Sequence, residues 1–359
     1  MANRKPSPKS EMIYRMPAEW EPHAATWLAW PHYEPDWPGK FEPIPWVYAE
    51  IIRYLSRGER VEVIVKDRAA EKTARKVLER AHALNENVGF HHWATNRVWT
   101  RDSGCAFVVP SRLGAGEGLA AIKWRFNGWA KYSNWQKDNK IGSLMAKAAG
   151  AMEIGAVFGG EPMVLEGGSI DINGRGTLLT TEECLLSKVQ QRNPGMKRRD
   201  YERAFGEYLG VSNVIWLGAG VVGDDTHGHI DDITRFVSPD TVVTCVDADP
   251  TSENYQALRE NIRRLRDATT EDAKPLATID LPMPAPVYFE GRRLPASYAN
   301  FYIANAAVLV PVFNDPNDRV AVDILADIFP DRDVVGIYCG DLIWGLGAIH
   351  CMTQQQPAV

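Results

Sequence analysis

The sequence predicts an α/β fold, because apolar strand-like runs alternate along the chain with amphipathic helix-like runs. The spacing of the helices hints at a unit of two or three strands plus a helix that is repeated about five times. The first expected strand is followed by residues 67–70, which contain no glycine. A doubly wound nucleotide-binding sheet, which places a glycine-rich phosphate turn at that point, is therefore not predicted.

The expected strands are short runs rich in β-branched and aromatic residues, and the expected helices carry apolar residues three and four positions apart. In chain order the strands are Val61–Lys66, Cys105–Pro110, Ala120–Phe126, Met163–Ile172, Thr177–Thr180, Val214–Leu217, Ile233–Val237, Thr241–Val246, Phe301–Phe313 and Val334–Tyr338. The helices are Trp46–Ser56, Ala69–Leu84, Ile141–Ala149, Asp200–Tyr208, Glu253–Ala268 and Val320–Ile328.

No low-complexity linker or abrupt change of composition divides the chain, and glycine and proline are spread along its whole length. We therefore expect residues 13–359 to form a single domain. Residues 1–12 are basic and polar, which predicts a flexible N-terminal tail and no signal peptide.

The composition argues against several classes of protein. A formal net charge of -6 provides no general basic field for nucleic acid. The most apolar stretch, residues 301–313, is shorter than the roughly 20 residues of a membrane helix, so no membrane partner is expected. Five cysteines without paired spacing argue against a disulfide framework and a zinc ribbon, and favour a reducing cytoplasm.

Residues 345–355 form a glycine-bearing turn that presents Cys351 among polar groups. Glycines allow the backbone to approach a ligand closely, and a thiol becomes a nucleophile where its surroundings favour the thiolate. Taken alone, a lone cysteine is more often a buried structural residue. Its polar neighbours make Cys351 the candidate nucleophile.

Residues 224–232 contain two histidines and four carboxylates. Such density allows a metal site, but no second cluster of this kind completes a two-metal centre, so no metal is predicted. The alternative needs only His229 and Asp231, which project to one face if they stand at a strand entrance.

Two further segments place carboxylates beside expected strands. Residues 99–104 combine Trp99 with Arg101 and Asp102, although alone they could form a surface turn with a local ion pair. Glu166 precedes two glycines in an apolar run, and a buried glutamate needs a partner, for which His229 is the candidate.

Together these segments match the requirements of guanidinium hydrolysis. A planar cation with fork-like donors is best held by two carboxylates, a role that suits Asp102 and Asp231. Its resonance-stabilised carbon needs a strong nucleophile, and the leaving amine needs a proton donor. We assign these two roles to Cys351 and His229. Glu166 would orient the imidazole, and Trp99 would line the path of the cation.

The chain resembles the agmatine deiminase and bacterial peptidyl-arginine deiminase family of the guanidino-group-modifying superfamily. The stretches that carry the resemblance run nearly end to end and are residues 16–23, 27–31, 177–186, 293–305 and the segment around Cys351. The resemblance implies a pentein-type, five-bladed α/β propeller, no cofactor and a homodimer. It also implies the five catalytic roles named above, with hydrolysis of agmatine to N-carbamoylputrescine and ammonia, a step of polyamine biosynthesis that leads toward putrescine.

The sequence departs from the family pattern around these residues. Leu346 and Ala348 replace a glycine and an asparagine, while Asp225 and His227 replace a glutamate and an aspartate. Asp224 and Asp225 could attract the ammonium end of agmatine, and no arginine lies in their segment to bind a carboxylate. A protonated His227 would weaken that field.

Other functions remain open from the sequence. The substrate could be free arginine, a peptidyl-arginine or another guanidine, and the same covalent intermediate could transfer its amidino group to an amine. A metal-dependent ureohydrolase built on residues 224–232 and a non-catalytic ligand-binding protein are the remaining alternatives.

Overall fold

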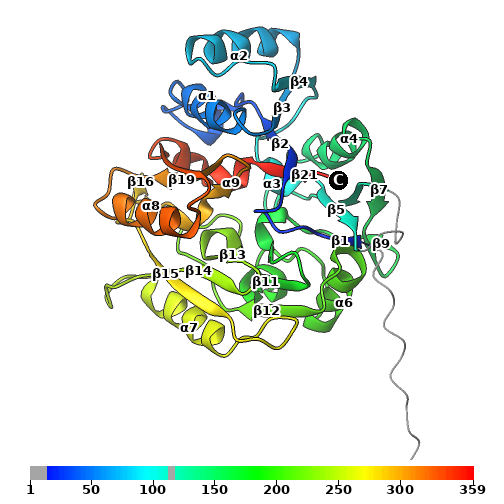
Figure 1. Ribbon diagram of the computed structural model, residues 1–359, viewed down its shortest axis with the longest axis vertical. Coiled ribbons are helices and arrows are strands. Elements are labelled where there is room, and N and C mark those ends of the chain that lie inside the picture. Colours follow the sequence, from blue (N-terminus) through cyan, green and yellow to red (C-terminus); the bar gives the residue numbers. More distant parts are fainter. Residues whose placement is uncertain (1–13, 112–117) are drawn as a thin grey trace, which may run out of the picture.

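The structure, a computed structural model, describes residues 14–111 and 118–359. The expected tail at residues 1–12 lies outside the described residues. The α/β class predicted from the sequence is confirmed, because sheets and helices alternate along the chain (Figure 1).

The strands of the described residues form five sheets of three or four strands and two short hairpins. In each of the five sheets, an inner strand pairs antiparallel with one neighbour and parallel with the other. The connection between the two parallel strands contains a helix. The strand orders are β21-β2-β3-β4, β1-β5-β6-β7, β10-β11-β12, β13-β14-β15 and β18-β19-β20. Figure 1 shows these five units arranged in a ring.

The strands of the five sheets have the following bounds: β21 (Gln354–Pro357), β2 (His23–Ala29), β3 (Arg60–Val65) and β4 (Val88–His92); β1 (Tyr14–Arg15), β5 (Ala106–Pro110), β6 (Ala120–Lys123) and β7 (Met152–Gly155); β10 (Asp171–Ile172), β11 (Thr177–Thr181) and β12 (Asn213–Leu217); β13 (Thr234–Ser238), β14 (Thr241–Val246) and β15 (Ala277–Pro282); β18 (Tyr302–Ile303), β19 (Ala307–Val312) and β20 (Asp333–Tyr338). The two hairpins are β8 (Val157–Phe158) with β9 (Glu161–Pro162), and β16 (Tyr288–Phe289) with β17 (Arg292–Arg293).

All six helices predicted from apolar periodicity are present. They are α1 (Ile44–Leu55), α2 (Arg68–Arg80), α4 (Ile141–Ala148), α6 (Arg198–Leu209), α7 (Tyr255–Arg266) and α8 (Asn317–Ile328). The segment at 67–70, which lacks a phosphate turn, begins a helix instead. The Asp67 side chain accepts the N–H of Ala70 and so caps α2. Four further short helices are α5 (Glu182–Leu186), η1 (Glu34–Asp36), η2 (Asp138–Lys140) and η6 (Leu342–Gly345).

A short helical turn precedes one strand of each sheet, namely β5, β10, β13, β18 or β21, and points to the centre of the ring. The five turns are α3 (Thr100–Ser103), η3 (Gly167–Ser169), η4 (Ile230–Asp232), η5 (Tyr298–Asn300) and α9 (Ile349–Met352). Each turn packs against two others, in the closed order α3, η3, η4, η5, α9 and back to α3. Segments far apart in sequence therefore meet at one point.

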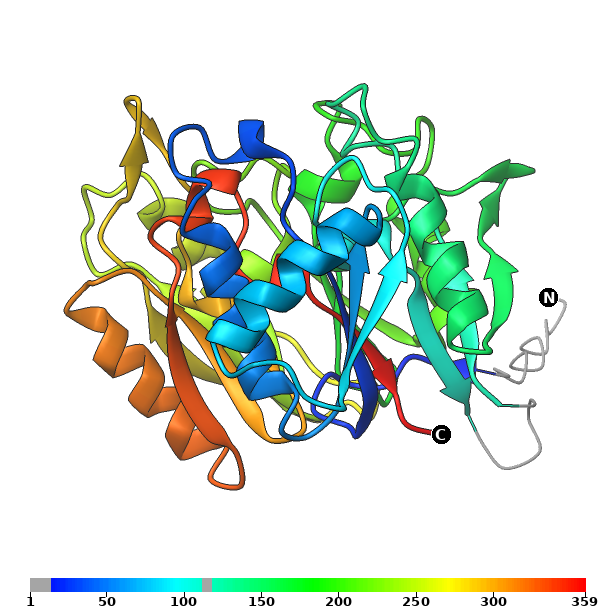
Figure 2. The same ribbon diagram turned by 90° about the horizontal axis from the view of Figure 1, so that it is seen from above.

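Two strand predictions differ from the structure. Residues 163–172 were expected to form one strand, but only Asp171–Ile172 do, because Gly167–Ser169 turn into the centre of the ring. Residues 301–313 were expected to form one run, but the chain reverses between β18 and β19. Several strands of the five sheets were not predicted, among them β2, β4, β7, β15 and β21. Strand β21 contains three glutamines, so it lacks the apolar signal of a strand, yet it pairs with β2 (Figure 2).

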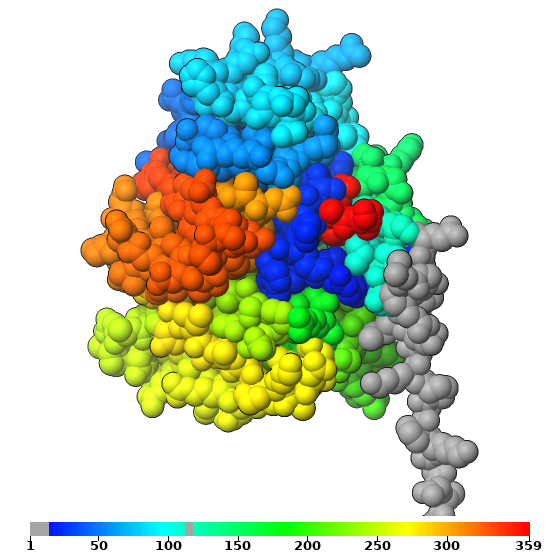
Figure 3. Space-filling model, in the orientation of Figure 1, coloured from blue at the N-terminus to red at the C-terminus, as the bar shows by residue number. Residues whose placement is uncertain are grey.

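The N-terminal segment between β1 and β2 crosses the middle of one face, where Figure 3 shows it in dark blue. It carries Glu19, which is 5% exposed. The Glu19 carboxylate contacts Arg101 at 3.2 Å, Arg235 at 2.9 Å and His350 at 2.9 Å, and accepts the N–H of Ile303 at 2.9 Å. Burial alone would raise its pKa, but the charges of Arg235, His350 and Arg101 hold the pKa well below its usual value.

No helix in residues 14–111 and 118–359 is both long enough and apolar enough to cross a bilayer. The five cysteines all lie within these residues, and none of them forms a disulfide. The absence of a disulfide framework predicted from their odd number is therefore confirmed.

We predict that Glu19→Gln lowers the free energy of unfolding by about 3–5 kcal/mol, because it leaves the buried charge of Arg101 without a counter-ion and the buried charge of Arg235 with Asp171 alone. Urea denaturation measures this change. The matched control is Glu21→Gln, since Glu21 pairs with the half-buried Arg15, and it should cost at most about 1 kcal/mol. An equal loss in the two variants would contradict the central role of Glu19.

Candidate active site

The ring of short turns brings together the five residues predicted to be catalytic. Asp102 lies on α3, Asp231 on η4 and Cys351 on α9, while Glu166 and His229 immediately precede η3 and η4. The Cys351 sulfur lies 3.7 Å from a carboxylate oxygen of Asp231. The imidazole of His229 lies 3.7–3.9 Å from carboxylate oxygens of Glu166, Asp102 and Asp231.

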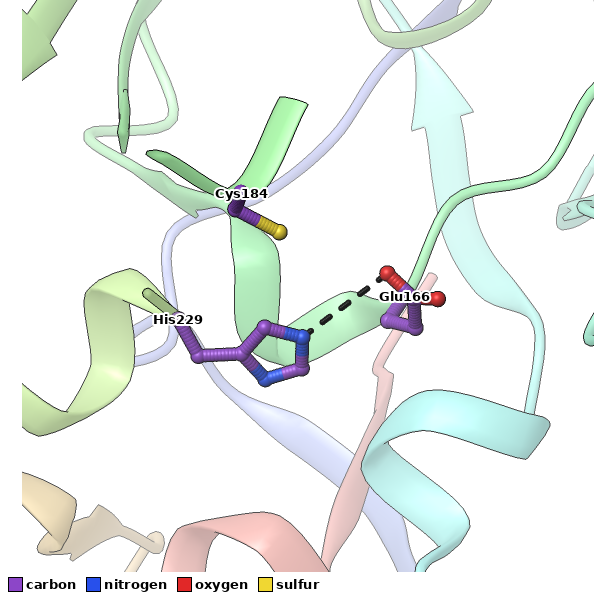
Figure 4. Close-up of side chains that lie close together, drawn as sticks. All are labelled: Glu166, Cys184 and His229. Carbon is purple, nitrogen blue, oxygen red and sulfur yellow. Dashed lines mark ion pairs between the residues drawn. The ribbon is translucent and has the colours of Figure 1, made fainter. Parts of the chain in front are cut away.

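His229 is 1% exposed and neither ring nitrogen has a hydrogen-bond partner within the described residues. Figure 4 shows its ring directed at Glu166, with the thiol of Cys184 nearby. Burial lowers the pKa of His229, but the charge of Asp102 and the contacts with Cys184 and Glu166 outweigh burial and raise the pKa well above its usual value. The imidazole is therefore held as a cation at neutral pH, with a proton that no hydrogen bond retains.

Gly168 lies directly against the imidazole. A Cβ at this position would stand 2.5 Å from His229 Nδ1 and 3.0 Å from an Asp102 oxygen, closer than real atoms approach. The paired glycines noted in the sequence are thus required by the approach of two candidate catalytic side chains. Gly347 serves a similar purpose, because its Cβ would stand 2.7 Å from Trp99.

The two carboxylates nearest to Cys351 differ in their surroundings. Asp102 accepts the indole N–H of Trp129 at 2.8 Å and the N–H of Gly168 at 3.0 Å, and burial with neighbouring carboxylates raises its pKa to about 6. Asp231 contacts His350 Nδ1 at 2.7 Å, and this contact overcomes burial and lowers the pKa of Asp231. The other oxygen of Asp231 has no hydrogen-bond partner. Both residues can therefore present negative charge to a cation.

The Cys351 thiol accepts a hydrogen bond from the side-chain amide of Asn300 at 3.1 Å. Burial and the charges of Asp231, Asp232 and Asp102 raise the pKa of Cys351 well above its usual value. In the absence of a cation the thiol is therefore protonated. A bound cation between the carboxylates would offset their charge and favour the thiolate.

Cys351 and Asp102 line a pocket with a volume of about 280 Å³. Trp99 also lines it, as predicted, and packs against Trp37 with ring centroids 5.9 Å apart. Leu346, which replaces a family glycine, adds an apolar side chain to the pocket wall at the cost of a left-handed backbone conformation (φ 69°). The volume is close to the lower end of small-molecule sites, which is about 300 Å³.

Asp225 also lines the pocket, but its carboxylate already has three partners. It binds Lys131 at 2.6 Å, Tyr132 at 2.5 Å and Arg292 at 2.7 Å. Two cations thus offset the charge that the sequence argument assigned to Asp225 for attracting an ammonium group. No arginine lies in the segment of Asp225 itself, but Arg292 reaches its carboxylate from a distant part of the chain.

The other polar residues of 224–232 do not act as the sequence argument expected. Asp224 accepts the N–H groups of Thr226, Gly228 and His229 and so holds the loop that carries the imidazole. His227 contacts Ser187 at 3.1 Å and does not line the pocket. Ala348, the other departure from the family pattern, is 1% exposed and packs in a small apolar cluster.

The carboxylates of residues 224–232 do not converge on one ion. Asp224 accepts a backbone N–H group, and Asp225 binds the ammonium group of Lys131. Asp231 contacts His350, and Asp232 accepts the side-chain amide N–H of Asn300 at 2.9 Å. Two buried triads among the described residues bring ligand-type atoms within 4.8 Å of one another, namely Glu166 with Cys184 and His229, and Asp231 with Asp232 and Cys351. Both triads include candidate catalytic groups, and neither matches the metal cluster considered from the sequence.

Several residues that support the site were not singled out by the sequence argument. His350 links Asp231 to Glu19, Asn300 binds Cys351, and Arg192 binds Glu166 at 3.1 Å. Glu19 and Asn300 lie in stretches that carried the family resemblance, which is the signal that could have identified them. His350 is next to Cys351 in the sequence, whereas no motif around Arg192 marks it as a residue of the site.

Known proteins resemble this chain over nearly its whole length. The sequence profile of the Porphyromonas-type peptidyl-arginine deiminase family matches residues 15–357. A relative from Latilactobacillus sakei, named "Putative agmatine deiminase", is 34% identical over the full length of both chains. The solved structure of Enterococcus faecalis agmatine deiminase is 29% identical, with a TM-score of 0.87 over 99% of both chains. A substrate-bound cysteine-to-serine variant of C. jejuni agmatine deiminase is 29% identical, with a TM-score of 0.83 over 96% of both chains.

We predict that iodoacetamide alkylates Cys351 before Cys105, Cys184, Cys245 or Cys339. Cys351 alone among the five lines the pocket, while the others are at most 1% exposed. Because thiolate is the reactive form and the pKa of Cys351 is raised, the rate should be low at pH 7 and increase steadily to pH 10. Mass spectrometry of tryptic peptides measures both effects. First modification at Cys105, or a rate that is independent of pH, would contradict the assignment.

Proposed function

This chain belongs to the Porphyromonas-type peptidyl-arginine deiminase family of amidine hydrolases, which includes agmatine deiminases, and from that premise we propose that it hydrolyses a small guanidinium compound through Cys351. One observation carries the proposal above all. A thiol at the base of a small pocket lies 3.7 Å from a buried carboxylate that has an unpaired oxygen, in a site with a second carboxylate and an imidazole. Burying this much negative charge is costly unless a cation completes the site.

The proposed reaction has two stages. The Cys351 thiolate attacks the guanidinium carbon, which is held between Asp102 and Asp231, and forms a tetrahedral adduct. His229 donates a proton to the departing nitrogen, ammonia leaves, and an amidino-thioether remains. His229 then takes a proton from water, the hydroxide attacks the same carbon, and collapse of the second adduct releases a ureido product and the thiolate.

The electrostatics of the free site support this order of events. The three carboxylates near Cys351 keep its thiol protonated, so an empty site is unreactive. A guanidinium ion would neutralise part of that charge and lower the thiol pKa at the moment the carbon is in place. Nucleophile formation would thus depend on a bound cationic substrate. Glu166, which is paired with Arg192, would keep the imidazole of His229 in its reactive orientation.

We extend the proposal to the architecture and the assembly. The five sheets, with their closed ring of turns, correspond to a five-bladed α/β propeller that forms one catalytic domain over residues 13–359. A homodimer in a reducing cytoplasm, without a cofactor, is the expected state by resemblance to the family. Size-exclusion chromatography coupled to light scattering tests the dimer.

Agmatine is the first substrate to assay, because it is the compound after which the relatives are named. Its hydrolysis would give N-carbamoylputrescine and ammonia in equal amounts. Amidino transfer would instead require an acceptor amine, and a metal-dependent ureohydrolase would release urea and lose activity with a chelator. A protein that only binds a guanidine would release neither product.

We predict that the protein releases ammonia from guanidines without an acceptor amine, and that Cys351→Ser lowers kcat by more than about 10³-fold, because an alkoxide is not accessible at neutral pH. A glutamate dehydrogenase-coupled assay measures ammonia, and circular dichroism verifies the fold. Cys105→Ser is the control and should retain activity, since Cys105 lies outside the site. Activity in Cys351→Ser that matches the control would refute the nucleophile.

We also predict that Gly168→Ala lowers kcat by about 10²-fold, because the added methyl group displaces His229 from its position against Asp102. Gly155→Ala is the control, since nothing lies within 4 Å of a Cβ at that position on β7, and kcat should not change. Steady-state kinetics of both variants provides the measurement. An unchanged kcat in Gly168→Ala would mean that the position of His229 does not limit the reaction.

A further inference from the structure

The pocket wall beyond the reacting centre is defined here by five charged side chains, which are Asp36, Arg97, Lys131, Asp225 and Arg292. Four of them line the pocket, and Lys131 reaches it through Asp225. They come from five separate parts of the chain, so their juxtaposition is a product of the fold. None of them belongs to the set of five catalytic candidates.

The carboxylate of Asp225 is saturated by its neighbours. Lys131 and Arg292 each donate to the same oxygen, and Tyr132 donates to the other oxygen. Burial raises the pKa of Asp225, but these three hydrogen bonds outweigh burial and lower it. Little negative potential therefore remains at Asp225 for an incoming ammonium group.

Arg97 stands on the same wall between two aromatic rings, with its guanidinium carbon 4.3 Å from the ring centre of Tyr132 and 5.4 Å from that of Tyr33. It pairs with Asp36, but its Nε has no hydrogen-bond partner. Burial raises the pKa of Asp36 to about 6, and at neutral pH its carboxylate offsets the charge of Arg97. Asp138 lies behind this pair and is engaged by the N–H groups of Asn96 and Arg97.

The wall thus carries three cationic side chains against two carboxylates. An ammonium group placed there would meet an excess of positive charge, whereas a carboxylate could bind the guanidinium of Arg292, which lines the pocket and is 52% exposed. The catalytic centre has the opposite sign, with Asp102 and Asp231 around Cys351. The whole pocket is therefore complementary to a molecule with a positive end and a negative end.

We infer that the substrate is a small guanidino acid, whose guanidinium group lies against Asp102 and Asp231 and whose carboxylate faces Arg292, Arg97 and Lys131. This inference rests on the proposed deiminase function and makes it more specific. It distinguishes this chain from an enzyme selective for agmatine, which ends in an ammonium group. The pocket volume of about 280 Å³ suits one small molecule.

The test compares three guanidines that share four methylene groups and differ only at the far end. They are agmatine with an ammonium end, pentylguanidine with a methyl end, and 5-guanidinopentanoate with a carboxylate end. We expect kcat/KM to rise in that order, by about tenfold or more from agmatine to 5-guanidinopentanoate, the effect of a charge-assisted hydrogen bond. A dipeptide that ends in arginine is the fourth probe, and faster turnover of the dipeptide would overturn the assignment to a small acid.

Substitutions on the wall test the cause of the preference. Arg292→Gln and Lys131→Gln should each reduce the ratio of kcat/KM between 5-guanidinopentanoate and agmatine, and the double variant should reverse it, because two carboxylates then oppose one cation. Turnover of pentylguanidine reports the catalytic centre alone and should change least. Arg319→Gln is the control, since Arg319 is 83% exposed and pairs with Asp323 on α8, and its ratio should match the parent.

The four probes distinguish failure of the proposed deiminase function from failure of the inference about the far end of the substrate. If none of the four probes releases ammonia, the proposed deiminase function is refuted. If pentylguanidine and agmatine are hydrolysed in a Cys351-dependent manner but 5-guanidinopentanoate is no better than agmatine, the deiminase function stands and the inference about the far end is overturned. A preference that survives the double variant unchanged would also overturn it.

Discussion

The buried carboxylate of Glu19 is the interaction on which the arrangement of the site depends. It binds Arg101, whose neighbour on α3 is Asp102, and it binds His350, whose neighbour on α9 is Cys351. His350 in turn holds Asp231 on η4 through its other nitrogen. One side chain from the start of the chain thus fixes three of the five turns that form the ring. Because a buried ion pair costs desolvation, its value here is positional: it holds Cys351, Asp102 and Asp231 in one geometry before any ligand binds.

The same centre explains why reactivity and binding are coupled. Asp102, Asp231 and Asp232 surround a thiol whose pKa they raise, and Asp102 is also the strongest influence that raises the pKa of His229. An empty site would therefore hold a protonated thiol next to a cationic imidazole, and only the thiol has to lose its proton before attack. A bound planar cation would lower the pKa of the thiol without a conformational change, because the carboxylates are already in place. Electrostatic preorganisation and protection of the thiol from side reactions are two results of one charge distribution.

Local patterns predicted the helices and the reactive residues, and long-range contacts account for what was missed. The six helices follow from apolar periodicity, and Cys351, His229, Asp102, Asp231 and Glu166 stood out by chemistry and by family resemblance. The strand expected at 163–172 failed because Gly167 and Gly168 let the chain turn beneath His229, a constraint that comes from a residue about 60 positions away. The partners of Asp225 could not be foreseen for the same reason, since Lys131 and Arg292 are distant in sequence and adjacent only in the fold.

The unpaired imidazole of His229 also bears on whether the site is catalytic or merely binds a cation. Both ring nitrogens are buried without a hydrogen bond, and each such group costs about 1–3 kcal/mol. A protein that only binds a cation would hold a guanidinium more tightly without a positive charge between its two carboxylates. The protonated imidazole lies 3.9 Å from both Asp102 and Asp231, which stabilise it and raise its pKa, but it competes with a guanidinium for the same carboxylates. The acid role proposed for His229 would account for this competition, because proton transfer to a leaving nitrogen needs a donor beside the bound cation.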